Sequence, residues 1–333
     1  MKLFRYLLPV ALVLAGVLSQ GCKKETDPEY SSLTGALSLS MPPYVEPGYT
    51  KTFMIDTLMK VSRPDGGTVG YRFYDSNTGK YDTLVTANGQ ILKHHYTFTA
   101  GEKLQSFNLS LTAFAPDDSY YYSTSAYCTY TIVKPGMTPD SSITGFEVSM
   151  FNITDPRDER SYYIIKAGDR DWMRQNLAWE GAGKPFQYCS AMTDVFGRYY
   201  TWEEAQTACP PGWHLPSDAD WTALSEGAAP GRDIPALAGE VMGDLYFNGT
   251  KMWEYWRDVK ITDKQKLSII PVGYATVADK DYTFQGIYTY AAFWTSDESD
   301  GMGVFRYIYQ DKDIVYRGRT SKTDFAASVR CVR

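Results

Sequence analysis

The stretch that decides the fold of this chain reads CPPGWHLPSDADW and runs from Cys209 to Trp221. Its three prolines have a fixed φ and no amide donor, so they end one helix and shape the turn before the next. Thr201-Trp202-Glu203-Glu204 before it and Ser217-Asp218-Ala219-Asp220 within it both follow the order of a capping box. We therefore predict short helices over residues 201–208 and 217–226.

The chain beyond the second helix is rich in apolar and β-branched stretches of strand length. Two short helices followed by a β-rich remainder indicate an α+β domain. The predicted strands cover Lys266 to Ala278, Ala291 to Ser296, Val304 to Gln310, Asp313 to Tyr316 and Ala327 to Val332.

The first half of the chain has the pattern of an all-β domain over residues 33–134. Apolar residues alternate with polar ones from Phe107 to Ala115 and again from Tyr120 to Val133, which buries one face of each strand. Residues 71–85 predict a hairpin, because two strand-like stretches flank a turn-rich centre. About seven strands in roughly 100 residues fit an immunoglobulin-like β-sandwich.

A stretch with prolines and a glycine separates this domain from the next. Residues 135–145 have no hydrophobic period, so we predict a linker there and a second domain over residues 146–333.

The amino terminus reads as a targeting segment. Lys2 and Arg5 precede an apolar run that ends at Leu18, which is shorter than the roughly 20 residues of a membrane span. Small residues before Cys22 and a polar stretch after it resemble a bacterial lipoprotein signal. That resemblance implies removal of residues 1–21, acylation of Cys22, a tether over residues 22–32 and a place at the outer membrane or cell surface. The alternative is ordinary secretion with a free Cys22.

Composition excludes some functions. A formal net charge of −6 with 22% charged residues argues against nucleic acid as a partner. Three histidines leave little for a histidine-based active site or a zinc cluster. The 27 Tyr, 15 Phe and 8 Trp are typical of β-structure and of binding surfaces, since a tyrosine has an apolar body and a polar tip.

Five blocks of the second half resemble one family in their order and spacing. Besides residues 209–221 they are Asp171–Leu177, Gly197–Trp202, Phe293–Ser296 and Ser328–Val332. Together they closely resemble the Fibrobacter succinogenes major paralogous domain, over residues 146–333. The resemblance implies a C-type-lectin-like fold, similar to formylglycine-generating-enzyme-type domains, and a context of bacterial surface lipoproteins and adhesins. It implies no biochemical activity, and where many members carry two cysteines ahead of the Gly197 block, this chain has only Cys189.

The cysteines fit an oxidising compartment. Without Cys22, four cysteines remain and allow three pairings. The resemblance implies that the chain end returns beside the helical region, so we pair Cys209 with Cys331. A loop of that length is worth about 4–5 kcal/mol in the chain-entropy model. Cys128 is expected to be a small buried thiol, and a bridge between Cys128 and Cys189 stays open as an alternative.

The resemblance also implies where a ligand would bind. On the lectin-like fold ligands meet the irregular region before the last strands, here residues 278–285 and 297–300. In this region and near it, Tyr282 and Trp294 are candidates for stacking on sugar rings, and the candidates for hydrogen bonds to hydroxyl groups are Asp297, Glu298 and Arg306.

Two other interpretations of the acidic loop stay open. In the first, it is a solvated loop over a core tryptophan. In the second, Asp297, Glu298 and Asp300 supply oxygen ligands to calcium. The Glu-Pro-Asn, Gln-Pro-Asp and Trp-Asn-Asp triplets of calcium-dependent lectins are absent from the chain, so we predict no cofactor.

These observations predict a surface-anchored binding or adhesion lipoprotein. Its C-terminal lectin-like head would recognise a glycan, a peptide or a partner protein, and the lipid would hold it to a membrane. One alternative is a structural subunit of a surface fibre or outer-membrane assembly. Another is an enzyme on a formylglycine-generating-enzyme-like fold, which needs reactive thiols, whereas Cys331 is assigned here to a disulfide.

Overall fold

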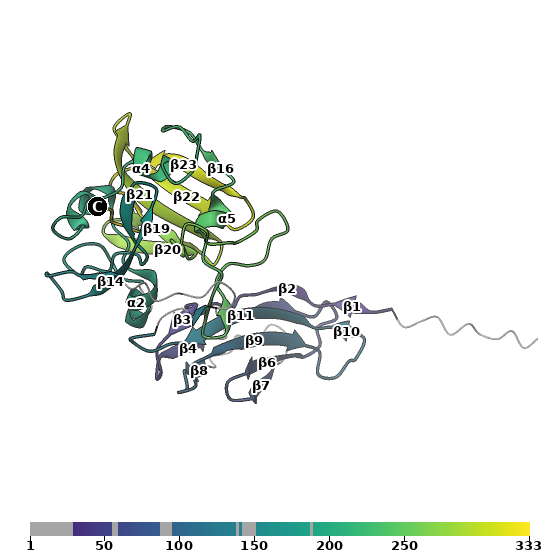
Figure 1. The fold of residues 1–333 in the computed structure, drawn as a ribbon. Helices are drawn as coiled ribbons and strands as arrows, with labels where there is room; N and C mark the ends of the chain where they lie inside the picture. The colour runs from purple at the N-terminus through teal and green to yellow at the C-terminus, as the bar shows by residue number, and fades with distance from the viewer. Residues whose placement is uncertain (1–28, 55–58, 87–94, 138–139, 142–150, 187–188) are drawn as a thin grey trace, which may run out of the picture.

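The computed structural model describes residues 29–54, 59–86, 95–137, 140–141, 151–186 and 189–333. Strands far outnumber helices in it, so the chain is β-rich, with an amino-terminal β-sandwich followed by a second body that we call the head (Figure 1). The predicted signal segment, Cys22 and most of the tether lie outside the described residues. Within the described part, no helix has the length and apolarity needed to cross a membrane.

The sandwich is built from the short strands β1 (Ser31–Ser32), β2 (Thr34–Leu37), β3 (Tyr44–Val45), β4 (Thr50–Met54), β5 (Met59–Ser62), β6 (Val69–Asp75), β7 (Lys80–Thr86), β8 (His95–Thr99), β9 (Ser106–Phe114), β10 (Tyr121–Tyr122) and β11 (Thr124–Ile132). One five-stranded sheet has the order β3-β11-β9-β6-β7, and the pairs β2–β5 and β4–β8 face it. The core between these layers contains Phe53, Phe73, Phe98 and Leu111.

The alternation predicted from Phe107 to Ala115 is confirmed, whereas the stretch from Tyr120 to Val133 is divided into β10 and β11. In β9 the residues Phe107, Leu109 and Leu111 are buried, and every second residue between them is more exposed. The hairpin predicted over residues 71–85 is the antiparallel pair β6–β7. The first strand begins at Ser31, two residues before the predicted start of the domain, because β1 pairs with β10.

The head contains the strands β12 (Asp140–Ser141), β13 (Asn152–Thr154), β14 (Ser161–Ala167), β15 (Arg170–Met173), β16 (Ile234–Pro235), β17 (Leu245–Phe247), β18 (Thr250–Lys251), β19 (Val272–Ala278), β20 (Asp281–Ile287), β21 (Tyr290–Ser299), β22 (Met302–Tyr309), β23 (Ile314–Thr320) and β24 (Phe325–Ala326). Its main sheet has the order β16-β23-β22-β21-β19-β20, with β24 paired to β19. The smaller sheets have the orders β13-β14-β15 and β12-β17-β18.

The helices of the head are all short: η1 (Ser190–Met192), α2 (Thr193–Phe196), α3 (Trp202–Ala208), α4 (Asp218–Thr222) and α5 (Ala238–Val241). Both predicted capping boxes are formed, by Thr201 with Glu204 and by Ser217 with Asp220. Helix α4 is shorter than the prediction of residues 217–226. After it the amide of Leu224 bonds to the carbonyl of Trp221 three residues back, which makes tighter turns than an α-helix.

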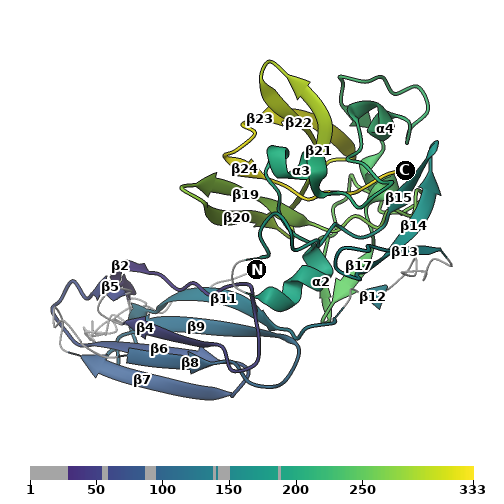
Figure 2. The same ribbon diagram turned by 90° about the vertical axis from the view of Figure 1, so that its left-hand side faces the viewer.

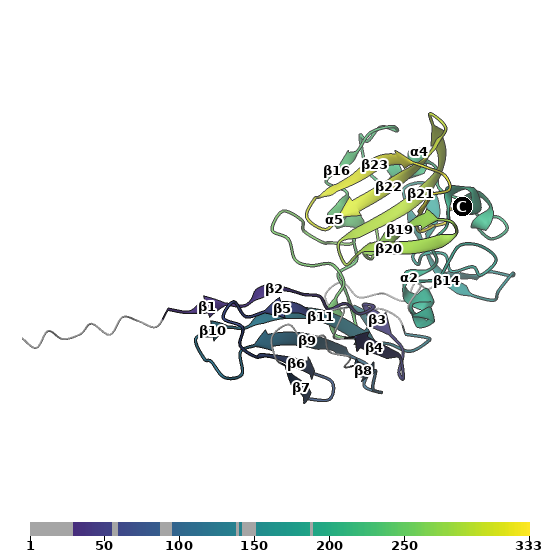
Figure 3. The same cartoon turned by 180° about the vertical axis from the view of Figure 1, so that it is seen from behind.

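The two faces of the main sheet differ. Residues of α4 and α5 pack on one face, in a core that includes Trp221, Val241, Phe293 and Ile308. The other face carries aromatic rings and is the one seen in Figure 3. Near α3 this second face is covered, since Trp202 donates its indole N–H to the carbonyl of Thr295 at 3.0 Å.

Two strand predictions for the head were too long. Of the stretch 266–278 only Val272–Ala278 is a strand, because the carbonyls of Lys266 and Leu267 accept hydrogen bonds from buried arginine side chains. Residues 327–332 form no strand. They form isolated β-bridges instead, to the partners Tyr200, Phe293, Trp172 and His214.

The end of the chain closes the head. Arg333 and Asp171 exchange backbone hydrogen bonds, which sets the terminus beside β15 (Figure 2). The predicted disulfide between Cys209 and Cys331 is formed, with 5.8 Å between the Cα atoms and a sequence separation of 122. Cys128 and Cys189 are both free cysteines, so the alternative bridge between the domains is not formed.

The sandwich and the head share a packed junction. Tyr44 of β3 is fully buried among head residues, with its ring 5.2 Å from Phe196 and 6.0 Å from Phe247. The carboxylate of Glu46 accepts hydrogen bonds from the Ser190 hydroxyl at 2.8 Å and the Ala191 amide at 3.1 Å. The described residues of the predicted linker are also engaged, because β12 pairs with β17.

Candidate functional site

The structure does not gather the predicted ligand-binding residues into one site. Trp294 is fully buried, and its indole N–H donates to the carbonyl of Tyr200 at 2.7 Å. Its ring packs edge-to-face against Phe305 and Phe325 at 5.9 and 5.4 Å. A fully buried ring offers no face to a sugar, so the predicted stacking role of Trp294 is corrected to packing in the core.

Arg306 lies on the opposite face of the sheet and is also fully buried. Its guanidinium lies 2.6 Å from the carboxylate of Asp218 and donates to the carbonyl of Arg232 at 2.7 Å. The same carboxylate lies 3.4 Å from the guanidinium of Arg317 and accepts from the amide of Gly231. Arg306 therefore holds α4 and its following loop to the sheet, and the predicted contact with ligand hydroxyls is corrected.

The acidic residues of the loop 297–300 have separate partners. Asp297 accepts a hydrogen bond from the amide of Asp218 at 2.6 Å, so it satisfies a free N–H at the start of α4. Glu298 pairs with Lys322, and Asp300 pairs with Arg319. The three carboxylates do not converge as calcium ligands would, and the described residues hold no group of three or more His, Cys, Asp or Glu side chains that could bind a metal.

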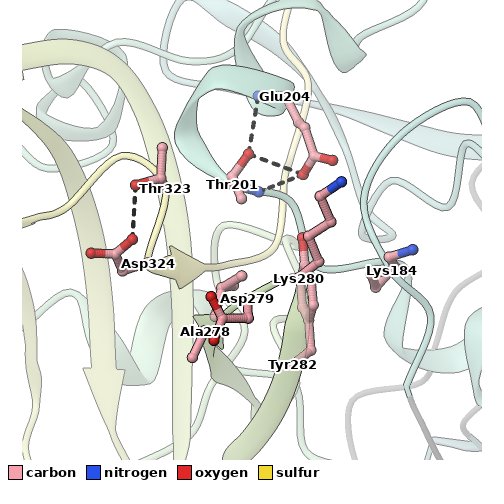
Figure 4. Close-up of a pocket in the computed structure, with 10 residues that line it drawn as sticks. Lys184, Thr201, Glu204, Ala278, Asp279, Lys280, Tyr282, Thr323 and Asp324 are labelled. Atoms are coloured by element: carbon pink, nitrogen blue, oxygen red, sulfur yellow. Dashed lines mark hydrogen bonds between the residues drawn. The ribbon is translucent and has the colours of Figure 1, made fainter.

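Tyr282, one of the predicted residues, lines a cavity. It stands on β20 in a pocket of about 790 Å³, a size typical of small-ligand sites. Figure 4 shows Lys184, Lys280 and Tyr282 along one side of this pocket, with Glu204 and Thr201 above them. The opposite side is formed by Asp279, Thr323 and Asp324.

Local structure fixes several side chains of this pocket. The carboxylate of Glu204 accepts from the amide and hydroxyl of Thr201 at 2.8 and 3.0 Å, as part of the α3 capping box. Asp279 and Lys280 form the two-residue turn between β19 and β20, with φ values of 50° and 71°. A two-residue turn needs positive φ values at both positions to match the twist of the strands it joins. Here the turn places two charged residues in the lining of the pocket.

The electrostatics of the pocket are mixed. Burial, with the charge of the nearby Glu204 carboxylate and a hydrogen bond to it, raises the pKa of Tyr282 to about 12. Within the described part of the chain, neither Lys184 nor Lys280 forms an ion pair. The pocket therefore presents unpaired ammonium donors, carboxylate acceptors and a tyrosine ring in one space.

A second surface is aromatic. Tyr274, Tyr307, Tyr309 and Tyr316 come from β19, β22 and β23, on the sheet side that carries Tyr290 and Phe305; we call the four the tyrosine face. The rings of Tyr307 and Tyr316 stack at 5.1 Å, and Tyr309 lies 6.0 Å from Tyr316 and is 45% exposed. The ring contacts of Tyr307, Tyr309 and Tyr316 between the adjacent strands β22 and β23 are a tertiary feature that the sequence did not reveal.

These features define a β-rich protein of two packed bodies, with a ligand-sized polar pocket at the β19–β20 turn of the head. The family model of the Fibrobacter succinogenes major domain matches residues 165–333. The chain belongs to this family. Comparison with curated proteins and with solved structures finds no match for it.

Several residues of the pocket were missed by sequence analysis. Lys280 and Asp279 fall within the predicted segment 278–285, but Lys184, Glu204 and Asp324 are distant from it in the chain. Glu204 carries a sequence signal of its own, the capping box, which indicates a structural role. Its second role at the pocket follows only from the position of α3 beside the β19–β20 hairpin (Figure 4).

Proposed function

We propose that this protein is a recognition protein of the bacterial surface, and that its head binds a neutral glycan in the pocket of Tyr282. The observation that carries the proposal is the lining of that pocket, which combines a tyrosine ring with unpaired lysines, carboxylates and hydroxyl groups. Sugars present hydroxyl groups that both donate and accept hydrogen bonds, and apolar ring faces that pack on aromatic side chains.

The lining favours a glycan over other ligands. Among the described residues that line the pocket, only Val277 and Ala278 have aliphatic side chains, which disfavours a purely apolar ligand. Lysines and carboxylates stand together, which disfavours a ligand of high charge of either sign. A neutral, polyhydroxylated ligand fits both conditions, because each charged group strengthens a hydrogen bond to a neutral hydroxyl.

Fold and anchoring complete this proposal. We assign the sandwich to the immunoglobulin-like class, since two layers of short strands enclose its core and the strand β3 pairs in parallel with β11. We assign the head to the C-type-lectin-like class on the family resemblance, supported by the chain end that returns beside β15. Lipid on Cys22 would hold the protein at the outer membrane or cell surface, and mass spectrometry of the mature amino terminus tests this directly.

Binding is tested with the full mature chain on a glycan array, followed by calorimetric titration of any sugar retained. Tyr282→Ala should weaken affinity roughly 30-fold, the effect of losing about 2 kcal/mol of contact in a binding hot spot. Tyr81→Ala, which removes an exposed tyrosine of the sandwich, is the matched control and should leave affinity unchanged. Equal affinity of the Tyr282→Ala protein, with its thermal unfolding unchanged, would exclude this pocket.

The tyrosine face favours a second candidate function, a subunit of a surface fibre or outer-membrane assembly. Tyrosine is enriched where proteins meet proteins, because its ring buries a large area and its hydroxyl still bonds at the rim. Crosslinking in intact outer membranes, compared between the wild type and a Tyr309→Glu variant, tests this function. Partners lost in the variant would support it, and an unchanged crosslinking pattern would argue against it.

The enzyme alternative gains no support from the free thiols. Burial raises the pKa of Cys128 to about 11, and burial with the nearby Glu46 carboxylate raises that of Cys189 to about 12. Both thiols are therefore protonated at neutral pH, whereas thiol chemistry uses the thiolate. Cys209 and Cys331 are joined in the disulfide.

A further inference from the structure

Three exposed tyrosines cluster at one end of the sandwich. Tyr30, Tyr120 and Tyr122 have 49%, 49% and 59% of their surfaces exposed. The ring of Tyr30 lies 5.8 Å from that of Tyr120 and stacks on that of Tyr122 at 5.0 Å. We call these three residues the tyrosine foot.

The foot has a defined place in the molecule. Strand β1 begins directly after Tyr30, and strand β10 contains Tyr122. The two strands pair in parallel, which brings these tyrosines together. Both strands lie at the end of the sandwich away from the head (Figures 1 and 3). The aromatic cluster therefore lies at the end of the sandwich where its first described strand begins.

One arginine pairs with three carboxylates beside the foot. The guanidinium of Arg63 lies over the ring of Tyr121 at 4.6 Å and forms ion pairs with Asp65, Asp117 and Asp118. Three carboxylates around one cation leave a net charge of −2 in this group, which disfavours an anionic surface as the partner. An uncharged or zwitterionic surface is favoured instead.

We infer that the tyrosine foot rests in the headgroup layer of a zwitterionic bilayer, the one that holds the lipid on Cys22. Tyrosine rings are enriched at this depth of membranes because their apolar bodies and polar hydroxyls meet both environments. The inference rests on the proposed acylation of Cys22. Eight residues lead from Cys22 to Tyr30, so even a fully extended chain keeps the foot within about 29 Å of the anchored cysteine.

The position of the foot would orient the whole protein. With the foot at the membrane, the head lies at the far end of the sandwich and its pocket is kept away from the bilayer (Figure 1). The alternative occupant is a second copy of the chain, with the two feet in contact. Such a dimer would cover the same rings in solution and would not set the orientation of the protein relative to the membrane.

The test uses the full-length lipidated protein with the substitution Tyr122→Trp in phosphatidylethanolamine–phosphatidylcholine vesicles. All eight native tryptophans lie between Trp172 and Trp294, in the head, so the fluorescence added by the variant reports the foot alone. We expect this added emission to shift to shorter wavelength and to lose most of its intensity when the acyl chains carry bromine near the headgroups. The matched control is Tyr81→Trp, on an exposed tyrosine that is 62% accessible and belongs to β7; its added emission should keep its wavelength and intensity.

The outcomes separate the two proposals. Mass spectrometry that finds no lipid on Cys22 would overturn the anchor and the foot together. If the protein is lipidated and the emissions added by Tyr122→Trp and by Tyr81→Trp are equally unquenched, the foot alone is overturned. A blue shift of the Tyr122→Trp emission without vesicles, dependent on protein concentration, would show a second copy on the foot and would also overturn the inference.

Discussion

Arg306 shows how a single buried charge is accommodated in the head. Its guanidinium is compensated by the carboxylate of Asp218 and a backbone carbonyl, and the amide of Gly231 donates to the same carboxylate. Burial lowers the pKa of Arg306, which the neighbouring Asp218 partly offsets. Breaking one partner of such a pair is costly because it leaves the other charge uncompensated in the interior.

We expect Arg306→Met to lower the free energy of unfolding of the head by about 3–5 kcal/mol, because Asp218 loses its closest cation. Arg319→Met removes an exposed ion pair with Asp300 and should cost about 0–1 kcal/mol. Urea unfolding of the two variants measures both values. Equal, small losses in the two proteins would contradict the structural role assigned to Arg306.

At the scale of single elements, α4 depends on its amino-terminal cap. Burial by itself raises the pKa of Asp220, but hydrogen bonds from Ser217 and from Arg170 outweigh it and lower that pKa below its ordinary value. Because the pKa is depressed in the folded state, ionised Asp220 stabilises the head above the ordinary carboxyl pKa. This contribution is lost as the pH falls through the depressed value.

Thermal unfolding followed from pH 6 down to pH 2 checks this linkage. The wild type should lose stability through the acid range, and Asp220→Asn should lose less over the same range while being less stable at pH 6. Asp281→Asn, at an exposed strand end, is the control and should follow the wild type. Parallel pH curves for the wild type and Asp220→Asn would refute the prediction.

At the scale of the whole molecule, the two bodies meet through apolar packing. Tyr44 of the sandwich belongs to the same core cluster as Phe186, Phe196 and Phe247 of the head. Two hydrogen bonds also join the bodies. The side-chain amide of Asn248 donates to the carbonyl of Ile132 at 2.6 Å, and the hydroxyls of Ser106 and Thr250 bond to each other. The head is thus packed directly on the sandwich.

We expect Tyr44→Ala to weaken this junction by about 3 kcal/mol, the usual effect of deleting a large buried ring. The measurements are calorimetry, in which the two bodies should unfold at more widely separated temperatures, and solution scattering, in which the radius of gyration should increase. Tyr127→Ala, an exposed ring of β11, should change neither. If Tyr44→Ala matches this control, the bodies do not stabilise each other.

Local signals of the sequence determined much of the secondary structure. The alternation in β9 and the two capping boxes depend on contacts within a few residues, so the sequence reveals them without any knowledge of the fold. The family resemblance, carried by blocks such as Gln175-Asn176-Leu177, added the disulfide. The structure explains one of these blocks, since buried Asn176 joins the carbonyl of Phe196 to the guanidinium of Arg330.

Only the tertiary structure decided which of the candidate side chains is available to a ligand. Trp294, Arg306 and Asp297 have suitable chemistry for a sugar, but their partners lie far away in the chain, and Asp297 binds an amide 79 residues distant. Burial and pairing of this kind depend on which elements pack together after long loops close, and no local pattern encodes that. Tertiary packing likewise brings Tyr282 together with Lys184, Glu204 and Asp324. The candidate site could therefore be identified only from the folded head.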